Sequence, residues 1–351
     1  MGARIVGWEG WVKGLHRLVS ATKWTQIRKP RLMSDADQAE YLHTKQVFQL
    51  SDTLSRDIQR LRPQKQHLLH YTSLDAFYNI MESGRVRLSS VKSTNDPSEF
   101  LFGVEVVQQG LREARSEARD EEQPIIDRCA DELINRNFKA FVFCMSEAIE
   151  DESEVGDLNQ WRLYGADGRG IALLFDISTQ PKWDELQTLI SIPRRVIYGE
   201  KEGVSFVKEQ IQEFFNNFRS LPKETQEYMG KLPDYMSGYL GNVLFWLPSV
   251  LKHKAYRHER EIRLIRGDIG EHAGNPLVFN DKGTIRRPSI ELPISNWDQS
   301  VEPSVQSSPI SRVIIGPSGD QAAIEDSVSY FLEARQWDAN VRRSDIPYRA
   351  V

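Results

Sequence analysis

Two short runs of almost wholly apolar residues, at 140–146 and 171–176, constrain the fold of this chain most. The first runs from Ala140 through Cys144 to Ser146, and the second runs from Ile171 to Asp176. A strand with one face in water alternates apolar and polar residues, whereas a strand covered on both faces is apolar throughout. Both runs therefore predict central strands of a β-sheet that carries other elements on each face.

Helical and strand-like patterns alternate around these two runs. Apolar residues recur at helical spacing over 74–83, Gly84 can end that helix, and 86–90 then alternates as a strand does. The other expected elements are helices interrupted near Pro222, Pro233 and Pro248 within 203–250, and a closing strand, helix and strand at 313–315, 321–335 and 340–342. The pattern predicts an α+β protein.

The first 62 residues are interpreted as a helical extension, and residues 63–351 as the main domain. Apolar residues recur at spacings of three and four from Trp8 to Val19, which places them on one side of a helix. A second helix is expected over about 35–61, before Arg62-Pro63. The apolar side of the first helix either packs on its own domain or makes the protein a homo-oligomer, or else the helix lies on a membrane surface or binds an acidic partner.

Composition favours a soluble, cytoplasmic protein. No stretch of the 351 residues approaches the ~20 apolar residues that cross a bilayer. Cys129 and Cys144 have no metal-site spacing, and with no signal-like apolar start they indicate a reducing compartment. The net charge of -5 does not mark a nucleic-acid binder, although seven basic residues against Glu9 alone in the first thirty-two could meet an anionic partner.

Two segments carry the residues most suited to chemistry. His70-Tyr71-Thr72 ends a short apolar run just before a predicted helix, which is a junction where clefts form. The stretch 258–265 reads as a strand with Glu259, Glu261 and Arg263 on one face. We expect the histidine and the Glu-x-Glu pair to share one pocket.

Glycosidic chemistry on a nucleotide suits this pair best. A carboxylate such as Glu261 can stabilise a developing oxocarbenium ion, and an aromatic ring such as Tyr164 can stack on a departing heterocycle. His67 with His70, and His253 with His258, could supply zinc ligands, but neither pair follows the helical His-Glu-x-x-His pattern. A Gly-x-Ser-x-Gly elbow and a phosphate-cradling glycine loop are absent from the sequence. A non-catalytic nucleotide-sensing module, a metal-dependent nuclease and a merely structural role for these residues stay open.

Four motifs follow one another in a fixed order along the chain, and a closing Val313-Ile314-Ile315-Gly316-Pro317 completes the pattern. This order resembles that of a large family of bacterial domains of unknown function, over roughly His67 to the end. The four motifs are His70-Tyr71-Thr72, Asn95-Asp96-Pro97-Ser98-Glu99, Trp161-Arg162-Leu163-Tyr164-Gly165 and Glu259-Arg260-Glu261-Ile262-Arg263.

That family in turn resembles a distant branch of the ADP-ribosyltransferase superfamily. The resemblance implies a mixed, split β-sheet flanked by helices, with NAD as the substrate and a protein or nucleic acid as acceptor. It also implies a role in bacterial toxicity or antiviral defence. Carried over by motif, Glu261 and Glu259 are the catalytic residues, and the NAD-binding residues are His70, Tyr71, Thr72, Ser146 and Tyr164.

Overall fold

The computed structural model describes residues 35–56, 58–93, 97–135, 140–149, 151–176, 193–267, 277–282, 285–294 and 309–349. The tryptophan-rich first helix, the homo-oligomer contact expected from it and the Asn95-Asp96 turn all lie outside these residues. The chain divides into two compact units. A helical unit comprises Met1–Ile58, Leu101–Phe138 and Gly199–Pro248, and a sheet unit comprises Gln59–Phe100, Lys139–Tyr198 and Ser249–Val351.

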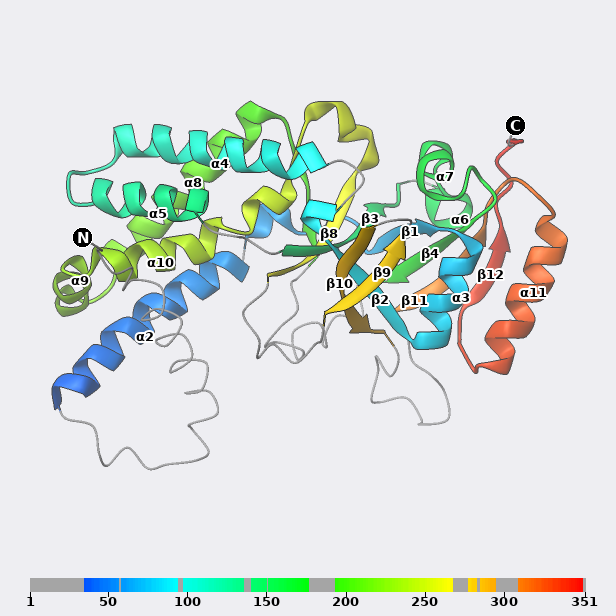
Figure 1. Ribbon diagram of the computed structural model, residues 1–351, viewed down its shortest axis with the longest axis horizontal. Helices are drawn as coiled ribbons and strands as arrows, with labels where there is room; N and C mark the ends of the chain where they lie inside the picture. Colours follow the sequence, from blue (N-terminus) through cyan, green and yellow to red (C-terminus); the bar gives the residue numbers. More distant parts are fainter. Residues whose placement is uncertain are drawn as a thin grey trace. The chain divides into compact units, whose positions relative to one another are not determined.

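The helical unit is organised around α10, which begins at a proline and is buried along most of its length. In this unit α10 packs against α2, α5, α8 and α9 (Figure 1). The breaks expected at Pro222 and Pro233 are confirmed, because they precede or begin α9 and α10. The helices are α2 (Asp35–Arg56), α4 (Pro97–Glu117), whose residues up to Phe100 belong to the sheet unit, α5 (Gln123–Asn135), α8 (Glu200–Arg219), α9 (Lys223–Gly230) and α10 (Pro233–Leu244).

This grouping differs from the expected division at residue 62. The helix predicted over about 35–61 is present as α2, but α2 packs with helices from the middle of the chain and not as a separate extension. Local periodicity identifies a helix, whereas the partner of its apolar side depends on contacts between residues far apart in sequence.

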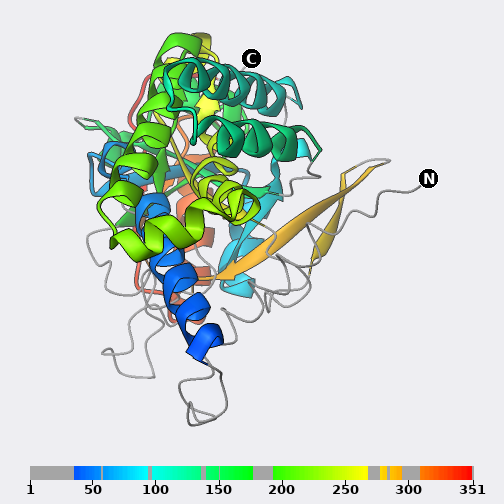
Figure 2. The ribbon, with the colours of Figure 1, turned by 90° about the vertical axis from the view of Figure 1, so that its left-hand side faces the viewer.

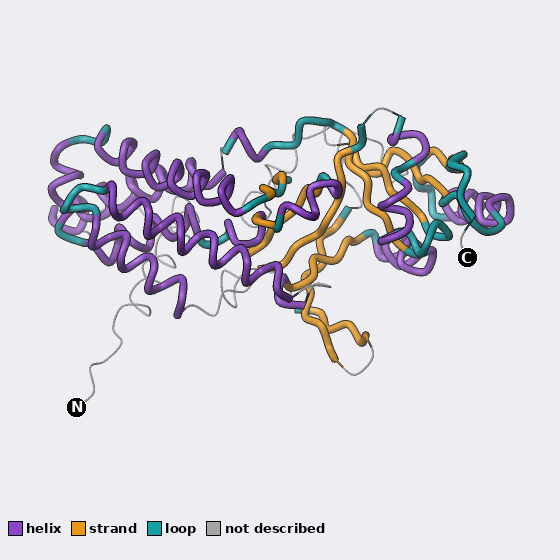
Figure 3. The backbone as a smooth tube through the Cα atoms, turned by 90° about the horizontal axis from the view of Figure 1, so that it is seen from above, coloured by secondary structure: helices purple, strands orange, loops and turns teal. Residues whose placement is uncertain are grey.

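The sheet unit contains a ten-stranded sheet. The sheet is mixed, as the fold-class prediction expected, and its strands are orange in Figure 3. Its main path runs β12-β11-β4-β1-β3-β2-β10-β9, and β8 and β5 branch from β3. The β11–β12 pair is parallel, while the other pairs of this sheet are antiparallel. The strands are β1 (His67–Thr72), β2 (Arg85–Ser90), β3 (Ala140–Glu147), β4 (Ile171–Asp176), β5 (Arg194–Arg195), β8 (Glu261–Gly267), β9 (Val278–Lys282), β10 (Ile285–Pro293), β11 (Ile310–Ile315) and β12 (Asn340–Arg343).

The sheet forks at β3. Strand β8 pairs with β3 along residues 140–146, and a strand has only two edges, so β1 and β2 share the other edge. Strand β2 pairs there with Phe141 and Val142, and β1 pairs with Ser146 and Glu147. A gap opposite residues 143–145 separates them, which gives the expected split.

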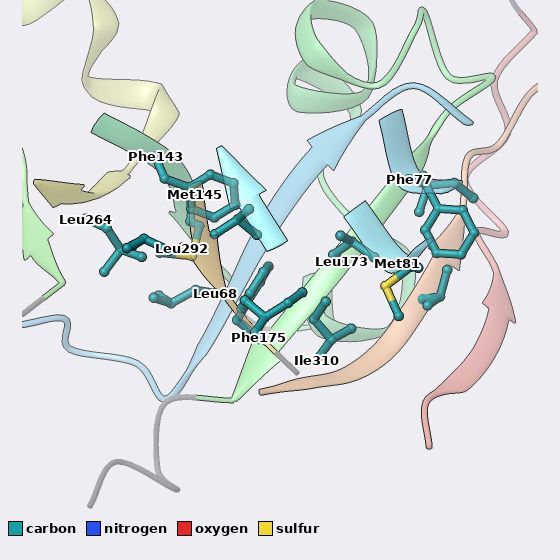
Figure 4. Packing of buried hydrophobic residues seen from close by; sticks show 14 of the residues in the cluster. Leu68, Phe77, Met81, Phe143, Met145, Leu173, Phe175, Leu264, Leu292 and Ile310 are labelled. Carbon is teal, nitrogen blue, oxygen red and sulfur yellow. The ribbon is translucent and has the colours of Figure 1, made fainter. Parts of the chain in front are cut away.

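The two faces of the sheet are covered by different helices. Helices α3 (Leu74–Ser83) and α11 (Gln321–Ala334) contribute Phe77 and Val328 to the larger core, with Leu68, Phe143 and Ile262 from the strands (Figure 4). The short helix α7 (Leu158–Tyr164) packs Trp161 on the other face, against Leu69, Tyr71 and Ala172. We call these the α3–α11 face and the α7 face.

Several local predictions of the sheet unit are confirmed. Gly84 ends α3 with φ 60, a left-handed conformation that glycine adopts without a steric penalty. Both apolar runs lie inside the sheet, since β3 pairs with strands on both of its edges and β4 lies between β1 and β11. The long β9–β10 hairpin, gold in Figure 2, was not foreseen, because charged and polar residues interrupt its apolar ones in the sequence.

None of the helices in the described ranges is long and apolar enough to span a bilayer.

Candidate functional site

The two glutamates of the Glu-x-Glu motif belong to different elements. Residues Lys254–Glu259 form a 3-10 helix, η5, Arg260 adopts φ 46, and β8 begins at Glu261. The strand expected over 258–265 therefore starts later than predicted. Nη2 of Arg260, the residue in the left-handed conformation, donates to Oε2 of Glu152 at 2.5 Å. This turn brings Glu259 and Glu261 to a common neighbour, Lys252.

The ammonium of Lys252 lies among three carboxylates. Its Nζ is 2.6 Å from Oε2 of Glu259, 3.0 Å from Oε2 of Glu261 and 3.1 Å from Oε2 of Glu99. Lys252 is the second residue of the two-residue strand β7 (Leu251–Lys252), which pairs in parallel with β6 (Ile197–Tyr198). Because Lys252 is only 5% exposed, these charges interact with little screening by water.

Arg263 forms the second cationic element of the cluster. Its Nε and Nη2 donate to the two oxygens of Glu261 at 2.8 and 2.9 Å, a bidentate geometry that fixes the carboxylate plane. Nη1 donates to the carbonyl of Ser249 at 2.7 Å, and Nη2 also pairs with Glu99. The guanidinium is 3% exposed and has hydrogen-bond acceptors on each side.

Three tyrosines border this cluster. The hydroxyl of Tyr164 donates to Oε1 of Glu259 at 2.9 Å, and the hydroxyl of Tyr198 accepts the backbone N–H of Glu261 at 2.8 Å. The ring of Tyr256 lies 4.8 Å from Nζ of Lys252, within cation–π range. Tyr164 is 40% exposed and Tyr256 is 36% exposed, so aromatic surface reaches solvent beside the buried charges.

The charges control each other's protonation. Burial alone would raise the pKa of Glu261, but Arg263 and Lys252 outweigh it and lower the pKa to about 2. Burial would lower the pKa of Lys252, and the nearby carboxylates raise it above its usual value instead. Burial together with Glu259 raises the pKa of Tyr164, whose hydroxyl therefore stays protonated at neutral pH.

These shifts predict an acid-sensitive fold. The pKa of Glu261 falls from 4.5 to about 2 on folding, so its ionisation stabilises the protein fully above pH 4.5 and this contribution is lost as pH falls toward 2. The loss amounts to roughly 3 kcal/mol. Urea unfolding between pH 7 and pH 2.5 measures it.

The matched comparison uses Glu261→Gln and Glu82→Gln, the latter removing an exposed carboxylate that pairs with Arg335. Glu261→Gln should unfold at lower urea at pH 7 and lose less further stability in acid than the wild type. Equal acid dependence in both variants and the wild type would contradict the assignment.

His70 lies on the other side of the sheet. Leu69, Ser146 and Glu261 occupy one register row across β1, β3 and β8, so their side chains share the α7 face. His70 follows Leu69 and therefore points to the α3–α11 face, where its ring lies 4.3 Å from that of Phe143. The imidazole and the Glu-x-Glu pair, which were expected to share a pocket, thus lie on opposite faces.

His70 occupies the gap in the forked sheet. Its Nδ1–H donates to the carbonyl oxygen of Cys144 at 2.8 Å, in the part of the β3 edge that neither β1 nor β2 reaches. The hydrogen-bond acceptor fixes the proton on Nδ1 and leaves Nε2 as an acceptor. Burial lowers the pKa of this histidine to about 4, so the ring is neutral at physiological pH.

The remaining predicted residues are divided between the site and the adjoining core. Ser146 is buried in register with Glu261, and Tyr164 contacts Glu259, so both belong to the cluster's surroundings. Tyr71 is buried edge-on to Trp161, with its hydroxyl accepting the backbone N–H of Asp157 at 2.7 Å. Thr72 is half-buried at the end of β1.

Sequence reasoning missed two members of the cluster. Glu99 was named only as the last residue of the Asn95-Asp96-Pro97-Ser98-Glu99 motif, but its carboxylate contacts Arg263 and Lys252. Lys252 was not considered, because lysine is rarely buried and the short run Val250-Leu251 before it does not mark it as an exception. The side of Arg263 was predicted correctly, but its bidentate pairing was not.

A groove in the helical unit is another possible site, and so would be a group of metal ligands. Helices α4 and α8 of the helical unit enclose a groove of about 390 Å³ lined by Glu113, Glu117 and Lys208, and Lys208 already pairs with Glu117 at 2.7 Å. Within the described part of the chain, no three His, Cys, Asp or Glu side chains are grouped as metal ligands. Neither observation moves the candidate site away from the Lys252 cluster.

Comparison with known proteins is limited to one family. No curated protein and no solved structure matches the chain. The model of a family described as "Protein of unknown function (DUF2971)" matches residues 160–264. That range includes Tyr164, Lys252, Glu259, Glu261 and Arg263. The match does not connect the chain to ADP-ribosyltransferases, and it makes the Lys252 cluster, apart from Glu99, part of the region similar to that family.

Proposed function

We propose that the Lys252 cluster binds NAD and breaks its nicotinamide glycosidic bond. The observation that carries the proposal is the meeting of Glu259 and Glu261 at one ammonium, under partly exposed tyrosine rings. A carboxylate close to the anomeric carbon stabilises the oxocarbenium-like transition state of such a cleavage. The ADP-ribose passes to a macromolecule or to water.

The proposed reaction breaks one bond, forms another and transfers one proton to a glutamate of the cluster. The bond from C1′ of the ribose to the nicotinamide nitrogen breaks, and its electron pair stays on that nitrogen, which becomes neutral. A hydroxyl, amine or water then bonds to C1′ and gives its proton to a carboxylate. We assign stabilisation of the transition state to Glu261 and orientation of the acceptor to Glu259.

The charge of the cluster suits a substrate with a cationic ring. Three carboxylates, from Glu99, Glu259 and Glu261, face one ammonium and one guanidinium, which leaves one negative charge. The nicotinamide ring of NAD is positively charged, and tyrosine rings favour cations above their faces. Tyr164 is 40% exposed and Tyr256 is 36% exposed, so both rings reach solvent beside the cluster.

The NAD-binding role that the resemblance implies for His70 and Thr72 is not proposed for the Lys252 cluster. The side chain of His70 points to the opposite face of the sheet and is engaged with Cys144. Ser146 lies next to Glu261 in the sheet register and can border the bound nucleotide. The acceptor class is a macromolecule, protein or nucleic acid, in the reducing cytoplasm of a bacterium.

Release of free nicotinamide from NAD tests the proposal. The pure protein should release nicotinamide, alone or with a cell extract that supplies an acceptor. Glu259→Gln and Glu261→Gln keep nearly the same volume and remove one charge, so each should lower the rate by about a hundredfold or more. Glu82→Gln, at an exposed carboxylate of α3, should retain the wild-type rate.

An absence of nicotinamide release from the wild type under every one of these conditions would refute the proposal. Loss of activity in Glu261→Gln counts only if its circular dichroism and unfolding midpoint at neutral pH show a folded protein, because the substitution also weakens the cluster.

One observation favours a second candidate, a nucleotide-binding module without turnover. Both oxygens of Glu261 are occupied by Arg263 and Lys252, so the carboxylate already has its full set of charged partners. Titration calorimetry separates the two functions. Binding of NAD without release of nicotinamide would favour the module, whereas release establishes the enzyme.

A further inference from the structure

The position of Lys252 suggests a role beyond neutralising charge. Arg263 contacts Glu261 and Glu99, whereas Glu259 is held by Lys252 and by the hydroxyl of Tyr164. Lys252 is therefore the cation that connects the two glutamates of the motif. Both carboxylates place their Oε2 atom on the same ammonium, at 2.6 and 3.0 Å.

The local fold holds this ammonium in place. Strand β7 pairs with β6, which fixes the backbone of Lys252 beside that of Tyr198. The side chain is 6% exposed, and its Nζ lies 4.8 Å from the centroid of the Tyr256 ring. Burial and three ion pairs therefore hold the ammonium among the carboxylates.

Two carboxylates this close cannot both stay ionised without a cation between them. Like charges a few ångströms apart in a buried site share a proton, and the pair then titrates as one unit. Arg263 compensates Glu261, but its contacts do not extend to Glu259. The ammonium of Lys252 removes the repulsion between the two glutamates.

We propose that Lys252 is a positioning residue for cleavage of the glycosidic bond, which keeps Glu259 and Glu261 ionised together at a fixed separation. This inference rests on the proposed function, because the two glutamates act there on the substrate. The ammonium does not itself touch the reacting atoms. It allows one carboxylate to face the developing oxocarbenium ion while the other accepts the proton of the acceptor.

Several other groups act on the same charges. They are, by element, Glu99 of α4, Cys144 of β3, Tyr164 of α7, Tyr198 of β6, Tyr256 and Glu259 of η5, and Glu261 and Arg263 of β8. The thiol of Cys144 and the hydroxyls of Tyr164 and Tyr198 have raised pKa values because of burial and the nearby glutamates, so they stay neutral. The carboxylates are thus the groups that respond to loss of Lys252 between pH 4 and pH 8.

Lys252→Met tests the inference through the pH profile of nicotinamide release. Methionine retains the length and most of the volume of the side chain but not its charge. The acidic limb of the profile should move to higher pH by about 1 to 3 pH units, because the two carboxylates then share a proton. Lys252→Arg should keep the acidic limb of the wild type, even where its larger head group lowers the rate. Lys254→Met, at an exposed lysine of η5, is the matched control and should leave the pH profile of nicotinamide release unchanged.

A second readout does not depend on activity. Protein labelled with ¹³C at the glutamate carboxyls should show, in Lys252→Met alone, a carboxyl resonance that titrates above pH 5. If the wild type releases no nicotinamide, the proposed function fails while this titration still decides the role of Lys252. An unshifted titration in Lys252→Met overturns the inference. If that variant does not fold, an acidic limb or a titration that shifts in Lys252→Arg overturns it as well.

Discussion

Replacing Arg263 with methionine should destabilise the protein by about 3 to 5 kcal/mol, the cost of leaving a buried charge without its partner. Arg263 is 3% exposed and donates to both oxygens of Glu261, to Glu99 and to the carbonyl of Ser249. Methionine fills much of the space but offers no donor. Three carboxylates would then remain around the single ammonium of Lys252.

Chemical denaturation at pH 7 measures this loss, and the matched control is Arg87→Met. Arg87 pairs with Glu291 across β2 and β10 at 3.0 Å, but it is half-exposed, and an exposed ion pair contributes less than about 1 kcal/mol. A lower pH should partly rescue Arg263→Met, because protonation relieves the repulsion between the carboxylates. Equal stability losses in the two variants would contradict the cluster as described.

Trp161→Ala should cost about 3 to 5 kcal/mol, as does loss of other fully buried large side chains. The indole is 0% exposed, its ring lies edge-on to Tyr71 at 4.9 Å, and its Nε1–H donates to the carbonyl of Val155 at 3.0 Å. Two glycines make room for it. A Cβ on Gly156 would clash with Nε1, and one on Gly165 would lie 2.5 Å from Cε3.

The effect of Trp161→Ala should reach the candidate site, because α7 also carries Tyr164 and Gln160. Tyr164 donates to the carboxylate of Glu259 and Gln160 donates to its backbone carbonyl. Trp337→Ala removes another buried indole, on the α3–α11 face, whose Nε1–H donates to Met81. Both variants should unfold at lower denaturant. A loss below about 1 kcal/mol for Trp161→Ala would show that α7 does not anchor this face.

The strands with the clearest sequence pattern were the most predictable. Burial on both faces makes β3 and β4 almost wholly apolar, and a left-handed residue at the end of α3 favours Gly84. The shared face of Glu261 and Arg263 was also predicted correctly, because alternation within one strand is a local property, whereas Glu259 was wrongly placed in the same strand.

The relation between His70 and Glu261 could not be predicted, because it depends on register between strands far apart in the chain. A shift of one residue in the β1–β3 pairing would exchange the faces of Leu69 and His70. Local sequence does not fix that pairing. The position of Lys252 depends likewise on β7 pairing with β6, and two-residue strands have no recognisable periodicity.

The arrangement of the sheet has a consequence for synthesis of the chain on the ribosome. Strand β4 lies between β1 and β11, and β11 in turn borders β12, so one edge of β4 stays unpaired until residues 310–315 have been made. Strands made earlier therefore keep part of their apolar surface accessible until β11 and β12 have been synthesised. Pairings of such long range form slowly, and a nascent protein of this topology is a natural client for chaperones that shield apolar segments.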